Sequence, residues 1–220
     1  MLNTAMTLTA PDGLSQSTDP AVFTELYNGS TNLCVWQREL PPEIIHYSDY
    51  LLNHHHHATE IRLTGTLTEL ERELTKTLPA HCARQAFTDN IIILADMLTC
   101  LLGAKAVGMR FCVASSATCP RFHVDKLGCR LITTYRGPAT QWLDNNDIDR
   151  NKLGPGAEGK PDSESGLYSR PDSIYQLSAG DVALLKGELW PGNEGNGIVH
   201  RSPPLEESQR RLFVTMDAIT

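Results

Sequence analysis

The order of apolar and polar positions predicts a helical first half of the chain. Four leucines recur at helical spacing within residues 66–78: Leu67, Leu70, Leu74 and Leu78. Thr66 and Glu69 have the spacing of a capping box at the start of this segment. A second helix is predicted over residues 80–103, where apolar residues occur on most sides. We expect both helices to belong to a helical scaffold over residues 41–103.

The pattern changes to that of β-strands after residue 103. Six segments have the composition of strands: residues 107–115, 120–125, 128–136, 173–187, 197–203 and 210–218. The polar stretch 144–172 predicts a long surface loop. Since no helical pattern separates the strands, we expect an antiparallel system, and the strand count suits a jelly roll. The predicted fold class is α+β: an antiparallel double-stranded β-helix, jelly-roll or cupin-like, with the N-terminal helices packed on it.

Length and composition predict one folded domain. The chain has 220 residues, of which 40% are hydrophobic and 20% charged, which is typical of a protein with a single packed core. Residues 1–20 are polar and rich in Thr, Ser, Asp and Pro, so we expect a flexible tail there. Residues 21–220 then form the domain, with the scaffold over 41–103 and a β-barrel core over 107–218.

The formal net charge of −7 disfavours general binding to nucleic acids or anionic membranes, because the field of the protein repels phosphate. The first 20 residues contain no Lys or Arg and no long apolar run, so they do not resemble a secretory or transit signal. No segment is expected to span a membrane. We therefore predict a cytoplasmic protein.

Four consecutive histidines run from His54 to His57. Neighbouring side chains on a helix point about 100° apart, so the four cannot converge on one metal ion. We interpret the run as a solvated loop or helix end, with weak metal capture as the alternative.

Six cysteines are spread along the chain without a CxxC pair, which is typical of small buried thiols in a reducing compartment. Cys119 and Cys129 flank a histidine-containing segment and are the two that a metal could reach. A thiolate ligand there would favour zinc over iron.

That segment holds the strongest candidate chemistry. His123 and Asp125 are two positions apart, so on an extended strand both side chains face the same point. A closed barrel could bring His200, on a later strand, beside them. Two histidines and one carboxylate form the facial triad of non-haem Fe(II) oxygenases. The alternative is a surface His–Asp pair, with His200 bonded to a backbone carbonyl.

A metal held by this triad keeps a net positive charge, which suits a chelating anion such as 2-oxoglutarate. The far carboxylate of that anion needs a fixed cation, and arginine binds carboxylates bidentately. Arg210 and Arg211 follow His200 by ten and eleven positions. The sequence leaves open which of them faces inward, because a shift of one residue along a strand exchanges its faces.

The order HxD, long gap, His and then Arg resembles the Fe(II)/2-oxoglutarate-dependent dioxygenases, whose double-stranded β-helix is related to the cupins. The resemblance covers roughly residues 107–218. It implies that His123, Asp125 and His200 bind Fe(II), and that Arg211 and Tyr135 contact 2-oxoglutarate. The RxS pattern common in these enzymes is absent, since Phe213 stands two positions after Arg211.

Three further segments, NLCVWQREL, CPRFHVDKLGCRLITTYRGPATQWL and GIVHRSPP, are similar to a bacterial family known only as a domain of unknown function. That family is often associated with zinc-responsive genes and GTPase metallochaperones. This resemblance implies the alternative function, a non-redox, zinc-binding, cupin-like module linked to zinc homeostasis, with Zn(II) as the metal and a metallochaperone as possible partner. A third interpretation is a metal-free interaction domain. No pattern in the sequence indicates the substrate.

Overall fold

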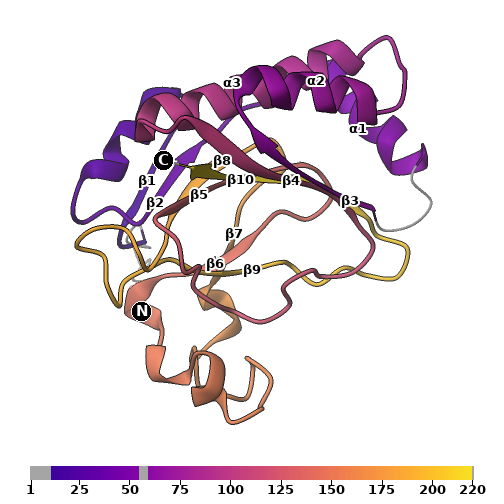
Figure 1. Ribbon diagram of the computed structural model, residues 1–220. Coiled ribbons are helices and arrows are strands. Elements are labelled where there is room, and N and C mark those ends of the chain that lie inside the picture. Colours follow the sequence, from indigo (N-terminus) through magenta and orange to yellow (C-terminus); the bar gives the residue numbers. More distant parts are fainter. Residues whose placement is uncertain (1–10, 55–58, 220) are drawn as a thin grey trace, which may run out of the picture.

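The structure is a computed structural model that describes residues 11–54 and 59–219. Figure 1 shows its layers: helices cover one face of a large sheet, and a small sheet lies on the opposite side of it. The α+β class with helices packed on a sheet is therefore confirmed.

The elements follow one another in a helix-first, strand-later order, with exceptions near the N-terminus. The strands are β1 (Leu14–Ser17), β2 (Leu33–Trp36), β3 (Thr59–Gly65), β4 (Ala106–Ala114), β5 (Cys129–Arg136), β6 (Gln141–Leu143), β7 (Ile174–Gln176), β8 (Val182–Lys186), β9 (Val199–Arg201) and β10 (Arg211–Ile219). The α-helices are α1 (Pro42–His54), α2 (Leu67–Thr77) and α3 (Arg84–Leu102). The 3₁₀-helices are η1 (Pro20–Tyr27), η2 (Asn145–Asp147), η3 (Arg150–Lys152), η4 (Gly154–Ala157) and η5 (Pro171–Ser173).

The large sheet has the strand order β1-β2-β8-β5-β10-β4-β3, and the small sheet has the order β7-β6-β9. The strand pairs are antiparallel except for β1 with β2. An apolar core fills the space between the two sheets, with Ile132 and Phe213 from the large sheet and Trp142 from the small one. A second core lies between the large sheet and the helices.

The helical layer forms largely as its sequence predicts. Thr66 and Glu69 make the complete capping box at the start of α2, and Leu70 and Leu74 are buried beneath it. The side chains of α3 that face the sheet are fully buried, so burial of one apolar face holds this helix in place.

Among the described residues one helix, α3, is long and apolar enough to cross a membrane by length and composition alone. Core helices of water-soluble proteins pass the same test. Phe87, Ile91 and Leu94 of α3 are completely buried against the sheet and its neighbours, which is the environment of a core helix. The cytoplasmic location stays a prediction.

Two sequence predictions need correction at the edges of the large sheet. Residues 14–17 of the expected tail form strand β1, because the carbonyl of Gly13 accepts the backbone N–H groups of Asn32 and Leu33 and so aligns β1 with β2. The expected helical scaffold over 41–103 contains the edge strand β3, which pairs with β4.

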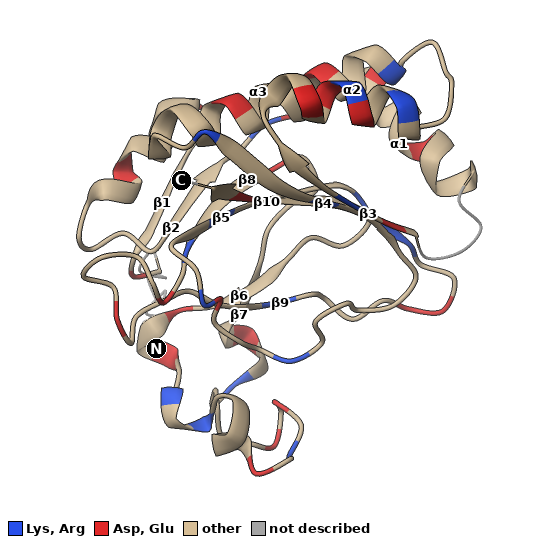
Figure 2. Ribbon diagram, in the orientation of Figure 1, with Lys and Arg blue, Asp and Glu red and all other residues tan. Residues whose placement is uncertain are grey.

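Alternation along β5 decides which residues can reach the space between the sheets. Cys129 and Leu131 lie in the core under the helices, whereas Ile132 lies in the core between the sheets. In Figure 2 acidic residues stand out on α2 and α3, while β4, β5 and β9 carry basic residues. Basic residues of this acidic chain therefore include arginines on strands that flank the inter-sheet space, among them Arg130 of β5 and Arg201 of β9.

Candidate metal centre

A reciprocal backbone bridge brings the two distant histidines together. The N–H of His123 donates to the carbonyl of His200 at 3.0 Å, and the N–H of His200 donates to the carbonyl of His123 at 3.0 Å. The two ring centroids are 4.6 Å apart. The expected strand over 120–125 is reduced to this bridge, which is enough to align the segment with β9.

The carboxylate of Asp125 lies between the two imidazoles. Nε2 of His200 is 3.4 Å from Asp125 Oδ2, and Nε2 of His123 is 3.7 Å from Asp125 Oδ1. The three ligand atoms lie within 4.8 Å of one another. The structure thus assembles the two nitrogens and one oxygen that the sequence predicted, in a partly buried setting.

Backbone carbonyls orient both imidazoles for metal binding. Nδ1 of His123 donates to the carbonyl of Arg121 at 2.9 Å, and Nδ1 of His200 donates to the carbonyl of Ile198 at 3.1 Å. Because a carbonyl oxygen only accepts, each Nδ1 carries the proton and the lone pair of the neutral ring lies on Nε2. Metal-binding histidines usually have such a partner on the second nitrogen.

The charges of the cluster also suit a cation. Burial, together with the charge of His200, lowers the pKa of His123 below its ordinary value. Burial alone would raise the pKa of Asp125, but His200 in its protonated form, through a hydrogen bond from Nε2 and its charge, and the charge of Arg130 lower this pKa to about 2. At neutral pH the site therefore offers a neutral imidazole and an ionised carboxylate, the forms that bind metals.

Arg130 is a site residue that the sequence did not reveal. Its Nη1 donates to Asp125 Oδ2 at 2.8 Å, while Nε and Nη2 donate to the two carboxylate oxygens of Asp217 at 2.8 and 2.7 Å. This bridge orients Asp125 from strand β5. Arg130 lies on β5 and Asp217 on the neighbouring strand β10, so no local sequence pattern could have indicated their contact.

The structure also resolves which of the paired arginines faces inward. Arg211 is only 2% exposed, and its Nη2 donates to the hydroxyl oxygens of Thr134 at 3.0 Å and Thr140 at 2.8 Å. Arg210, just before β10, points to the helical side of the sheet and donates to the carbonyl of Leu52 on α1. Arg211 is therefore the arginine that can reach a ligand between the sheets.

Phe213 occupies the position where the common pattern has serine. The guanidinium of Arg211 lies 4.3 Å from the centroid of the Phe213 ring, a cation–π contact. The two threonine hydroxyls supply the hydrogen bonds instead, and neither was predicted as a site residue.

The guanidinium of Arg211 is suited to an anionic ligand. Among the described residues no carboxylate pairs with it, and its buried Nε has no hydrogen-bond partner. Burial lowers its pKa to about 10. Arginine is almost never this buried without a counter-charge, so a carboxylate from a ligand fits the position.

A narrow cavity of about 40 Å³ connects this region with the histidines. His123, His200, Thr140 and Ser202 line it, and Thr140 and Ser202 both contact Arg211. A five-carbon diacid requires the lining side chains to move apart. The donor set at one end suits a divalent metal ion, and the guanidinium at the other end suits a carboxylate.

Tyr135 does not lie at this site. Its side chain is fully buried under α3, where the ring packs against Phe87 and the hydroxyl donates to Asn90 Oδ1 at 3.0 Å. The inward-facing neighbour on β5 is Thr134. The prediction for Tyr135 therefore selected the residue one position away from the one that faces the inter-sheet space.

The two candidate cysteines lie in different environments. Cys129 is buried in the core under the helices, on the opposite face of β5 from Arg130. Cys119 is exposed and lines the narrow cavity. Within the described parts of the chain, the cluster of possible metal ligands comprises His123, Asp125 and His200 without a thiol.

Of the histidine run, only His54 belongs to the described residues. It is the last residue of α1, and its ring stacks on Tyr50. The other three histidines of the run lie outside the described residues.

Comparison with known proteins gives a family and a fold. Residues 17–217 match the model of a family described as "Protein of unknown function (DUF1826)". No curated protein matches the sequence.

Two solved structures are similar over most of the chain. The dioxygenase for auxin oxidation (DAO) in rice has a TM-score of 0.52 at 11% identity, covering 86% of this chain and 74% of that one. JOX2, solved in complex with 2OG, Fe and JA, has a TM-score of 0.50 at 10% identity, covering 96% and 75%. At these identities the likeness shows a shared fold and no more.

Proposed function

The chain belongs to the DUF1826 family, proteins of unknown function, and we propose that it is an Fe(II)/2-oxoglutarate-type oxygenase that hydroxylates a substrate. The observation that carries the proposal is the convergence of His123, Asp125 and His200 next to a buried Arg211 that lacks a counter-charge. The His–Asp–His cluster suits Fe(II), Arg211 suits the far carboxylate of 2-oxoglutarate, and the narrow cavity connects the two.

The fold supports the proposal. Two facing sheets with the candidate ligands between them correspond to the two sides of a double-stranded β-helix, which we propose as the core of this protein. The likeness to two proteins named as an auxin dioxygenase and a complex with 2OG and Fe agrees with it. Open coordination positions at a facial triad are what an oxygenase needs.

The residues of this chain have separate tasks in the proposed reaction. His123, Asp125 and His200 hold the metal, and Arg130 holds the Asp125 carboxylate in position through its bridge to Asp217. Arg211 binds the far carboxylate of 2-oxoglutarate. When bound, Fe(II) and 2-oxoglutarate supply the oxidising chemistry: O₂ gives one oxygen atom to the substrate and one to succinate, with release of CO₂.

The proposal is tested by mixing the untagged protein with Fe(II) and 2-oxoglutarate under anaerobic conditions. We expect a visible charge-transfer band, lost in His123→Ala and retained in His46→Ala, which changes an exposed histidine on α1. A colourless mixture at saturating metal would overturn the proposal.

A second candidate is a zinc-binding module without redox chemistry. It is favoured by Cys119, which lines the narrow cavity and could add a thiolate to the cluster. The link to zinc homeostasis and to a metallochaperone partner stays a prediction. Equimolar zinc that survives dialysis, and is lost in Cys119→Ser, would favour this function over the oxygenase.

A further inference from the structure

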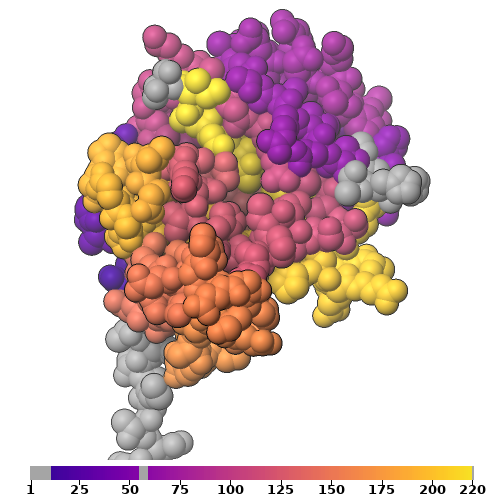
Figure 3. All heavy atoms as spheres, turned by 60° about the horizontal axis from the view of Figure 1, so that its bottom comes forward, coloured from indigo at the N-terminus to yellow at the C-terminus, as the bar shows by residue number. Residues whose placement is uncertain are grey.

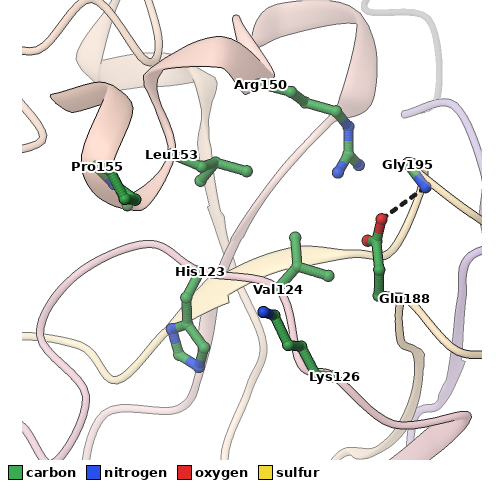
Figure 4. A pocket seen from close by; sticks show the side chains of 9 residues that line it. His123, Val124, Lys126, Arg150, Leu153, Pro155, Glu188 and Gly195 are labelled. Atoms are coloured by element: carbon green, nitrogen blue, oxygen red, sulfur yellow. Dashed lines mark hydrogen bonds between the residues drawn. The ribbon is translucent and has the colours of Figure 1, made fainter.

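A second cavity opens on the other side of His123. Its volume is about 410 Å³, and it is lined largely by apolar groups, with a few charged side chains (Figure 4). His123 lines both this cavity and the narrow one that leads toward Arg211. We propose that the larger cavity is the substrate site and that it takes a free α-amino acid with an apolar side chain. The proposal rests on the oxygenase function proposed above.

The middle of the cavity suits a hydrocarbon chain. Val124 lies between His123 and the far end of the cavity, and Leu153 and Pro155 face it from the long excursion between β6 and β7 (Figure 4). An aliphatic side chain placed there would extend toward His123, and burial of each methylene group favours binding. The substrate carbon nearest the metal would belong to this side chain.

The far end of the cavity carries one fixed charge of each sign. Nη2 of Arg150 donates to the carbonyl of Gly197 at 2.7 Å and also to the side chain of Asn145. Glu188 accepts the backbone N–H of Gly195 at 2.6 Å. Figure 4 shows both charged groups at the end of the cavity away from His123.

Arg150 and Glu188 leave binding capacity for a ligand. Within the described chain neither takes part in an ion pair, and the contacts of Arg150 use Nη2 alone. A free amino acid presents a carboxylate and an ammonium group on one carbon, which match a guanidinium and a carboxylate held side by side. A simple carboxylic acid would bring its charge close to Glu188, and a simple amine would bring its charge close to Arg150.

Lys126 adds a third charge at the rim of the cavity. It is exposed, so solvent screens its ammonium group and it contributes less to binding than the two charges at the far end.

The cavity is small for a folded partner, while an amino acid of about ten non-hydrogen atoms fits pockets of this order.

The wall contributed by the excursion is held firmly in place. Asp162 accepts the N–H of Phe122 at 2.9 Å and Nε of Arg121 at 2.6 Å, and it lies 3.4 Å from Nη1 of Arg201. In Figure 3 the excursion, coloured orange, forms a compact lobe on this face. These contacts tie the excursion to the segment that leads into His123, and small-molecule pockets are usually largely formed before a ligand arrives.

Calorimetric titration of the full chain with three probes tests the proposal without requiring activity. The probes are L-leucine, 4-methylpentanoate, which lacks the amine, and 3-methylbutylamine, which lacks the carboxylate. We expect L-leucine to bind about tenfold or more tightly than either analogue, because each analogue leaves one charged group of the site without its partner.

Two charge-neutral variants assign the selectivity to the two side chains. In Glu188→Gln, L-leucine should bind no better than 4-methylpentanoate, and in Arg150→Gln no better than 3-methylbutylamine. Matched controls are Glu158→Gln and Arg170→Gln, which change exposed residues outside the cavity and should leave all three affinities unchanged. If Arg150→Gln unfolds, Leu153→Asp places a carboxylate in the apolar middle instead and should abolish binding of L-leucine.

The outcomes separate this inference from the proposed function. Equal affinities for the three probes, or no binding at millimolar concentration, would overturn the amino-acid site, and so would N-acetyl-leucinamide binding as well as L-leucine. If the Fe(II)–2-oxoglutarate band forms in such a protein, the oxygenase function stands and only the substrate class is wrong. Charge-selective binding of L-leucine without the band would support the site and overturn the oxygenase.

Discussion

Replacing Arg211 with Met should change the stability of the protein little while removing most of its affinity for 2-oxoglutarate. Burial lowers the pKa of Arg211 from 12.5 to about 10, and a difference of this size corresponds to roughly 3 kcal/mol of unfavourable desolvation. Methionine has a similar length and packs well against an aromatic ring such as Phe213. The variant therefore loses an uncompensated buried charge without leaving a large cavity.

This gain is offset by lost hydrogen bonds. The charged guanidinium donates to Thr134 and Thr140, and a hydrogen bond to a charged group is worth roughly 1.5–3 kcal/mol. The two effects therefore nearly cancel, and the melting temperature should change by less than about 4 °C for a chain of this size. The missing contacts to a carboxylate should cost about 3 kcal/mol or more, so 2-oxoglutarate should bind roughly 100-fold more weakly.

The neighbouring arginine provides the control. Arg210→Met changes the same residue type at the position just before β10, where the side chain donates to the carbonyl of Leu52 on the helical side of the sheet. Melting of the metal-free proteins and calorimetric titration of the zinc-loaded proteins with 2-oxoglutarate measure both properties. We expect Arg210→Met to keep the wild-type affinity. The reasoning is refuted if Arg211→Met binds 2-oxoglutarate like the wild type, or loses the 3–5 kcal/mol or so typical of a broken buried ion pair.

Four other variants test the surroundings of single side chains. Tyr135→Phe removes the hydrogen bond to Asn90, so the unfolding free energy measured in urea should fall by about 1 kcal/mol. The variant should keep full affinity for 2-oxoglutarate. Weaker binding would show that Tyr135 contacts 2-oxoglutarate after all. Cys119→Ser should retain equimolar iron by metal analysis, whereas His123→Ala should retain none. Burial raises the pKa of Cys34 to about 12, so the unfolded chain loses this proton first and stability should fall as pH rises, by up to roughly 1.4 kcal/mol per pH unit between about pH 9 and pH 12. In Cys34→Ala, the unfolding free energy measured in urea should fall less steeply with pH over this range. The same pH dependence in the variant and the wild type would contradict a buried Cys34 thiol.

Local sequence patterns correctly predicted helix α2 and the shared direction of two candidate ligands. The capping box of Thr66 and Glu69 and the leucine spacing of α2 formed as expected, because a helix depends on contacts between residues three or four positions apart. The spacing of His123 and Asp125 also kept its meaning without a full strand. One backbone bridge to His200 keeps the segment extended enough to point both side chains to one place.

Interactions between residues on different strands could not be predicted from local sequence patterns. Arg130 contacts Asp217, which lies 87 positions away in sequence. Arg150 and Glu188 line one cavity because the excursion and the segment after β8 fold to the same place. Edge strands β1 and β3 belong to the same class, since each is held by a partner strand rather than by its own pattern.

By itself, the sequence determined the helices, the α+β class, the candidate triad and the presence of a cation eleven positions beyond His200. Only the tertiary structure decided that Arg211 rather than Arg210 faces inward, and that Thr134 rather than Tyr135 stands beside it. The physical reason is the two-residue period of a strand. A shift by one position exchanges its two faces, and the correct shift is selected by which side chains the helices bury on the far side of the sheet.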